Sequence, residues 1–181
     1  MWNKRTGREL LMATSEIKVI AAIVENKPGV LHSIANMFRR RGFNIESITV
    51  GHTEKKGLAR MTITLNGDEK TIEQVVKQMN KLIDVIKVNY LEKENIVARE
   101  LALVKIKVAD PKTRSDAINC VEVFRGRVVD VSPESLTIEI TGTSDKIDAF
   151  LNLMRTYGIL ELARTGLTAL ARGVKSIRIM E

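Results

Sequence analysis

Residues that serve in enzyme active sites and redox sites are scarce in this chain. Its 181 residues include one cysteine, Cys120, and two histidines, His32 and His52. A lone cysteine excludes an intrachain disulfide and a multi-cysteine metal site, so we expect Cys120 to be a small apolar residue on a helix. A metal site at His32 and His52 would need further ligands that the sequence does not place. Motifs for a serine nucleophile, a phosphate loop or a zinc helix are missing too, which favours a binding or regulatory protein without catalytic residues.

Long apolar runs and low-complexity tracts are also missing. The longest apolar runs are far shorter than the roughly 18 residues that span a bilayer. Three prolines and no Ser/Gly tract argue against long disordered regions. Lys4, Arg5 and Arg8 precede an apolar segment that is too short for a signal peptide. We therefore expect a flexible extension over residues 1–14, a cytoplasmic location and no membrane contact.

Aromatic residues make up only 4% of the chain, which argues against nucleic-acid binding despite the net charge of +7. RNA-recognition domains stack bases on aromatic residues of a third-strand motif that opens with a basic residue and a glycine. The matching stretch here opens with Lys56 and Gly57, but its aromatic positions hold Leu58, Arg60 and Ile63. We expect no nucleic acid among the partners, and the charge fits an acidic partner or a solvated surface.

Hydrophobic periodicity predicts the same order of elements twice. In the first half, strands are expected at 17–24, 43–50, 58–65 and 83–90, with helices at 30–41 and 72–82. In the second half, strands are expected at 101–108, 128–131, 136–140 and 159–163, with helices at 111–124 and 143–157. The candidate caps are Gly42 at the end of the first helix and Asp68 and Ser144 at the starts of the second and fourth.

Both halves follow the order β-α-β-β-α-β. The sequence therefore predicts an α+β protein with two ferredoxin-like domains in tandem, each an antiparallel sheet with two helices on one face. We expect the domains at 15–91 and 96–181, joined by a charged linker at 92–95, while 167–181 fits no clear element. The other face of the first sheet needs a cover, and an uncovered apolar face predicts association.

The turn after the first strand offers a site for an amino acid. Residues 26–31 place a Pro-Gly turn directly before the first helix, whose free N–H groups and dipole favour a carboxylate. Gly29 would let the backbone approach a small ligand closely. Asn26 offers donor and acceptor groups that suit an α-amino acid. A plain strand–helix turn capped by Asn26 would explain the same residues.

The same stretch carries a resemblance to a known family. Residues 25–31 (ENKPGVL) and 41–47 (RGFNIES) resemble the opening of an ACT domain, and more narrowly the small subunit of acetolactate synthase. Similar stretches follow at 60–63, 82–85, 99–105, 124–126, 129–131, 141–144, 146–150, 164–166 and 171–173. The resemblance thus extends through both halves, over roughly residues 15–174.

The resemblance implies a first domain of the ACT type that pairs with a second copy. In this family an effector amino acid, usually valine, binds between the paired domains in feedback inhibition. By position, the residues that would hold it are Asn26, Gly29, Val30 and Leu31 of one chain and Asn44 and Ile45 of the other. Val30 and Leu31 would also offer apolar surface to a branched side chain, and Pro28, which varies in the family, would tune affinity.

The resemblance also implies a homodimer that binds and activates a large catalytic subunit, which is the transferase. Thiamine diphosphate, Mg and flavin belong to that subunit, so no cofactor and no metal are expected in this chain. A free-standing ACT-type sensor would share the effector site but act on another partner. The preference among valine, leucine and isoleucine stays open at this stage.

Overall fold

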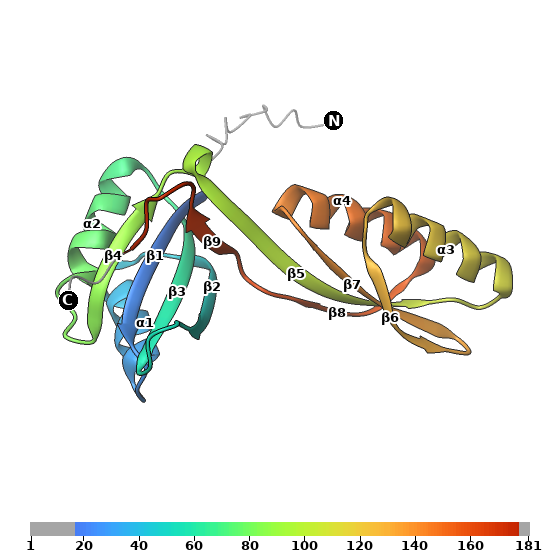
Figure 1. The fold of residues 1–181 in the computed structure, drawn as a ribbon, viewed down its shortest axis with the longest axis horizontal. Coiled ribbons are helices and arrows are strands. Elements are labelled where there is room, and N and C mark those ends of the chain that lie inside the picture. Colours follow the sequence, from blue (N-terminus) through green and yellow to red (C-terminus); the bar gives the residue numbers. More distant parts are fainter. Residues whose placement is uncertain (1–16, 178–181) are drawn as a thin grey trace, which may run out of the picture.

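The computed structural model describes residues 17–177, which form two α+β units (Figure 1). The first contains β1 (Ile17–Glu25), α1 (Val30–Arg41), β2 (Ile45–His52), β3 (Leu58–Asn66), α2 (Glu69–Met79) and β4 (Val85–Leu91). After the short 3-10 helix η1 (Lys93–Asn95), the second contains β5 (Ile96–Lys107), α3 (Pro111–Val123), β6 (Arg127–Ser132), β7 (Ser135–Gly142), α4 (Ser144–Met154), η2 (Arg155–Tyr157) and β8 (Ile159–Arg164). The chain then forms β9 (Thr168–Ala171). The extension expected at 1–14 and residues 178–181 lie outside the described residues.

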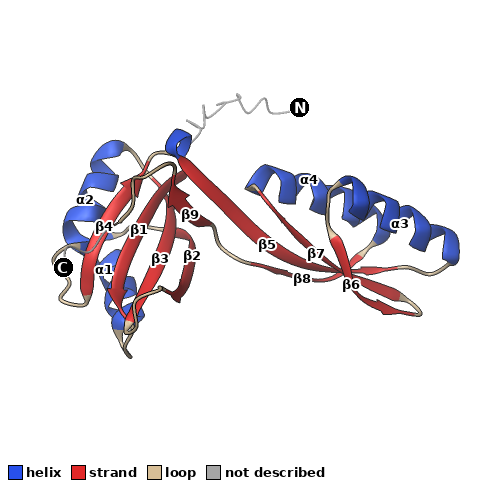
Figure 2. Ribbon diagram, in the orientation of Figure 1, coloured by secondary structure: helices blue, strands red, loops and turns tan. Residues whose placement is uncertain are grey.

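The predicted α+β class and the doubled β-α-β-β-α-β order are confirmed. The first sheet has the order β2-β3-β1-β4, and the main part of the second has the order β6-β7-β5-β8. Neighbouring strands pair antiparallel in both. Figure 2 shows the helices of each unit gathered on one face of its sheet. This is the ferredoxin-like arrangement, in which right-handed crossovers bring both helices to the same face.

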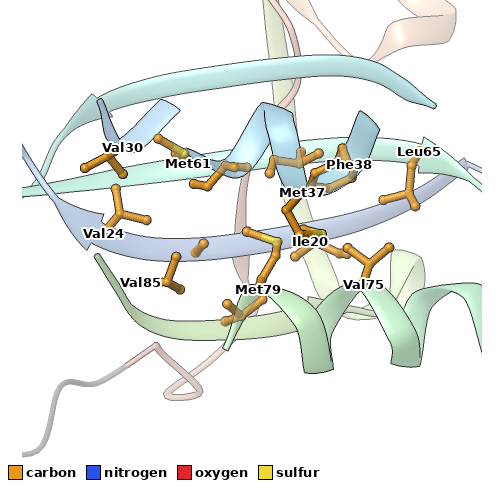
Figure 3. Close-up of a cluster of buried hydrophobic side chains, with 14 of the residues drawn as sticks. Ile20, Val24, Val30, Met37, Phe38, Met61, Leu65, Val75, Met79 and Val85 are labelled. Atoms are coloured by element: carbon orange, nitrogen blue, oxygen red, sulfur yellow. The ribbon is translucent and has the colours of Figure 1, made fainter. Parts of the chain in front are cut away.

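The core of the first unit lies between its sheet and its two helices. Alternate residues of β1 face the helices, as the two-residue period of a strand requires, and Ile20 and Val24 are fully buried among them. Figure 3 shows Phe38 of α1 and Met79 of α2 packed over this face. Burial of this apolar side orients α1, and so fixes where both of its ends lie.

The helix ends test the predicted caps. Gly42 ends α1 with φ 69°, and Asp68 caps α2 through its side chain, as predicted. The prediction that Ser144 caps α4 is wrong. The cap is Thr143, whose side chain accepts a hydrogen bond from the backbone N–H of Lys146. The hydroxyl of Ser144 instead donates to the Glu100 carboxylate on β5, so it serves tertiary packing.

The outer face of the first sheet, which faces away from the helices, is covered by the last part of the same chain. β5 was expected to begin at residue 101, but it begins at Ile96, because its first four residues pair with β9. Figure 1 shows β9 lying over the first sheet, on the side opposite α1 and α2. The buried residues of this second core are Val19, Ala21, Leu91, Ile96 and Ala169. The cover that the sequence required is therefore supplied within one chain, by the segment whose structure the sequence left open.

A charged cluster holds the second unit together where β5, α4 and β8 meet. Glu100 is 9% exposed and accepts hydrogen bonds from Ser144 and from Nε of Arg164. Nη1 of the same arginine lies 2.5 Å from Oδ1 of Asp148 on α4. Burial alone would lower the pKa of Arg164, but its hydrogen bonds to the two carboxylates raise it above the usual value.

We predict that Glu100→Ala lowers the free energy of unfolding by about 2 kcal/mol, because two hydrogen bonds to a buried charge are lost. Urea denaturation of the full chain measures this. Glu161→Ala is the matched control, since its ion pair with Lys105 is largely exposed and is worth less than about 1 kcal/mol. Equal effects of the two substitutions would contradict the assignment.

Candidate functional site

The N-terminus of α1 differs from those of the other three helices in the described residues. α2, α3 and α4 each begin after a residue whose side chain accepts a backbone N–H, namely Asp68, Asp110 and Thr143. α1 begins after Gly29, and no side chain caps it. Its first helical backbone bond runs from the Ser33 N–H to the Gly29 carbonyl. The N–H groups of this first turn are therefore open to an anionic ligand.

Gly29 is needed here for its backbone conformation. Its φ is +90°, a left-handed value that glycine adopts without strain, and nothing lies within 4 Å of where a Cβ would be. No other part of the chain therefore requires a glycine at this position by packing close to it. The space beside Gly29 is open in the described structure.

Asn26 does not cap α1, so the simple reading of this turn as an Asn-capped start is wrong. The backbone N–H of Asn26 donates to the Gly57 carbonyl at 2.8 Å. Its side-chain nitrogen Nδ2 lies 3.2 Å from Nδ1 of His52, at the end of β2. Asn26 thus lies directly after the end of β1, next to the β2–β3 hairpin, with an exposed side chain.

Val30 and Leu31, both expected to offer apolar surface to a ligand, differ in their exposure. The side chain of Val30 is 3% exposed and packs in the first core, so it has no surface to offer a ligand. This corrects the prediction for Val30, which could contribute only its backbone N–H. Leu31 is 50% exposed and can contact a ligand at the start of the helix.

Asn44 and Ile45 lie at the opposite end of α1. The helix has 12 residues and therefore a length of about 18 Å. Asn44 is exposed, and its Nδ2 donates to Oε1 of Glu46 at 2.9 Å. Ile45 is partly buried against the first core. A single chain therefore brings Asn26, Gly29 and Leu31 together but leaves Asn44 and Ile45 far from them.

Lys27 forms two ion pairs that fix the turn before α1, and the sequence analysis did not predict them. Nζ of Lys27 lies 2.5 Å from Oε2 of Glu25 and 2.6 Å from Oδ1 of Asp84. Hydrogen bonds to Asp84 and Glu25 raise the pKa of Lys27 above its usual value. The opposite charges of Glu25 and Lys27, two residues apart, could have indicated the first ion pair. The second one, with Asp84, depends on the fold.

The histidines and the cysteine have ordinary partners. Nε2 of His32 lies 2.7 Å from Nδ2 of Asn36, one turn along α1. Sγ of Cys120 lies 3.6 Å from the Tyr157 hydroxyl, and this hydrogen bond, with burial, raises the pKa of Tyr157 to about 12. Within residues 17–177, no group of three or more His, Cys, Asp or Glu residues is placed to hold a metal ion. No helix in that part of the chain is long and apolar enough to cross a bilayer.

Comparison with known proteins identifies the family over both units. The family described as "AHAS small subunit-like ACT domain" matches residues 20–87, and the family "small subunit of acetolactate synthase" matches residues 99–173. A probable acetolactate synthase small subunit of Methanothermobacter thermautotrophicus is 57% identical over 88% of this chain and 95% of its own length. The chain belongs to the acetolactate synthase small-subunit family. It is thereby a small, regulatory type of subunit in branched-chain amino-acid biosynthesis.

Other members of the family agree in sequence and in structure. The acetolactate synthase small subunit of Bacillus subtilis is 48% identical over 87% of this chain and 92% of its own length. The crystal structure of the small subunit from Thermotoga maritima superposes with a TM-score of 0.83 at 46% identity. That match covers 87% of this chain and 98% of the other. The predicted family and the ACT type of the first unit are therefore confirmed.

We predict that Gly29→Ala lowers the free energy of unfolding by about 1 kcal/mol, because an L-residue at φ +90° is strained. Gly51→Ala is the control, since it has open space and no left-handed φ, and it should keep the stability of the parent or raise it by up to about 1 kcal/mol. The midpoints of urea unfolding compare the two. A Gly29→Ala variant as stable as the parent would show that the turn relaxes.

Proposed function

We propose that the chain is the feedback regulatory subunit of acetolactate synthase and binds valine, or a related branched-chain amino acid, between two paired ACT domains. The observation that carries this is the open N-terminus of α1 beside Asn26, in a chain of this family. The amino acid's carboxylate would accept hydrogen bonds from the first N–H groups of α1. The Asn26 side chain would bind a polar group of the ligand, and Leu31 would contact its branched side chain.

The separation of the two half-sites supports a two-fold dimer. β2 is an edge strand of the first sheet, so it is available for pairing with another strand. Antiparallel pairing of two β2 strands would bring the start of one strand beside the end of the other. His52, at that end, already contacts Asn26, so Asn44 and Ile45 of the second chain would close the site at Asn26 and Gly29. An isologous interface of this kind creates two identical sites.

We further propose that residues 15–91 form the effector-binding and dimerisation domain and residues 96–181 the C-terminal domain. The start of β5 and β9 would then be a link that packs on the first domain. The large catalytic subunit would be the partner that this chain binds and activates, and it would hold thiamine diphosphate, Mg and flavin. Valine must bind the less active state of the complex more tightly than the active one, since only a differential affinity shifts the equilibrium.

The first test is binding of valine to the isolated chain. We predict that millimolar valine raises the melting temperature and that Asn26→Ala and Asn44→Ala each abolish the rise, because each removes one half of the site. Asn119→Ala, at an exposed position on α3, is the matched control and should keep the rise. Leucine and isoleucine in parallel scans rank the effectors. No rise with any of the three would refute the proposed site.

The second test concerns the partner. A pull-down with a thiamine-diphosphate-dependent large subunit should recover this chain, and the mixture should be more active than the large subunit alone. Added valine should lower activity only in the mixture, by the fivefold or more that a coupling of about 1 kcal/mol produces. Valine binding without capture of the large subunit would favour a free-standing ACT-type sensor.

A further inference from the structure

A large cavity lies between the outer face of the first sheet and the segment that follows β9. Its volume is about 900 Å³, which suits a metabolite-sized ligand. The sheet contributes Ile23 and Arg60 to its wall, and the other side is formed by residues 170–177 in part. The cavity is on the face opposite α1 and α2, so it is separate from the open N-terminus of α1.

The wall of this cavity carries an unusual arginine. Arg60 is partly buried, and its Nη2 donates to the Ala169 carbonyl of β9 at 2.8 Å. Its Nε is buried and has no hydrogen-bond partner among the described residues. No carboxylate forms an ion pair with it in this part of the chain, although Glu54 acts on it from a distance. Burial lowers the pKa of Arg60, which reflects a guanidinium charge that lacks compensation.

Arg164, a more exposed cation of the second unit, has the partners that Arg60 lacks. Arg164 contacts two carboxylates, those of Glu100 and Asp148. A partly buried cation without such a partner is costly, and an anion supplied from solution would offset that cost. Of these two arginines, Arg60 is therefore the one that could bind an anionic ligand without losing an existing ion pair.

The rest of the wall is also basic and polar. Lys55 and Lys175 join Arg60 there, while Glu54 is the one acidic residue of the wall in the described part of the chain. Other groups that can donate or accept hydrogen bonds also line it, namely His52, Thr53, Asn89, Tyr90 and Ser176. Arg60 and Lys175, against the carboxylate of Glu54, leave a positive balance at the wall, which attracts small anions.

We propose that this cavity binds a small organic anion through phosphate or carboxylate groups, with Arg60 as the central contact and Lys175 as a second one. The ligand would lie under the segment that covers the first sheet and would tie that segment to β3. His52 lines this cavity and also contacts Asn26. A bound anion would therefore lie next to a residue that contacts the turn before α1. The cavity wall contains none of the residues assigned to the valine site, so anion binding remains testable if that proposal fails.

Titration calorimetry with the full chain tests the proposal, using pyrophosphate and succinate as probes at matched ionic strength. We expect saturable binding of at least one probe, and the stronger of the two identifies the preferred group. Arg60→Gln and Lys175→Gln should each weaken binding at least tenfold, because each removes a cation from the wall. Arg39→Gln, which removes an exposed charge at the far end of α1, is the matched control and should bind as the parent does.

The outcomes separate the two sites. Asn26→Ala should keep anion binding while it loses any response to valine, because Asn26 does not line the cavity. If Arg60→Gln fails to fold, Lys175→Gln decides, since Lys175 is exposed. Absence of saturable binding for both probes would overturn the proposal. So would a loss in Arg39→Gln as large as in the cavity variants, which would mean general attraction to a basic protein.

Discussion

Burial of the outer face of the first sheet is the constraint on which the arrangement of the whole chain depends. Val19 and Ala21 are apolar on that face, and β9 with the first residues of β5 covers them. The chain must therefore leave the first unit along β5, build the second unit, and return. Near Gly166 the return path crosses β2 so closely that an added Cβ would lie 2.7 Å from Oγ1 of Thr49. The units are thus joined by two segments, and one of them lies against the strand assigned to dimerisation.

Packing of α1 sets the second constraint, which concerns function. The helix buries Val30 and Phe38 at its two ends, so neither end can shift along the sheet. Gly29 and Gly42, both with left-handed φ, turn the chain at these ends. Because of this separation, we assign the two groups of the proposed site to two copies of the chain. The separation also makes the proposed site sensitive to how the copies pair, which a regulatory subunit requires.

Local sequence signals were sufficient for most of the fold. Hydrophobic periodicity predicted the strands and helices of the two units within a few residues, except for the first five residues of β5, because each element buries one face. β9 was missed since its four residues gain stability only from long-range partners, Ile96 and the first sheet. For the site, the turn chemistry left open whether Asn26 caps the first helix, and the structure has an uncapped start at Gly29. The burial of Val30, the contact of Asn26 with His52, and the cavity at Arg60 arise from tertiary packing, which no local pattern encodes.

The central claim is that one effector site is built from two chains, and a mixture of two inactive variants tests it most directly. Asn26→Ala and Asn44→Ala homodimers should each fail to bind valine. After they are mixed and exchanged, a heterodimer has one site with both asparagines and one with neither. Calorimetry should then recover valine binding with about one site per heterodimer. Binding that stays absent after exchange is confirmed would contradict a shared site.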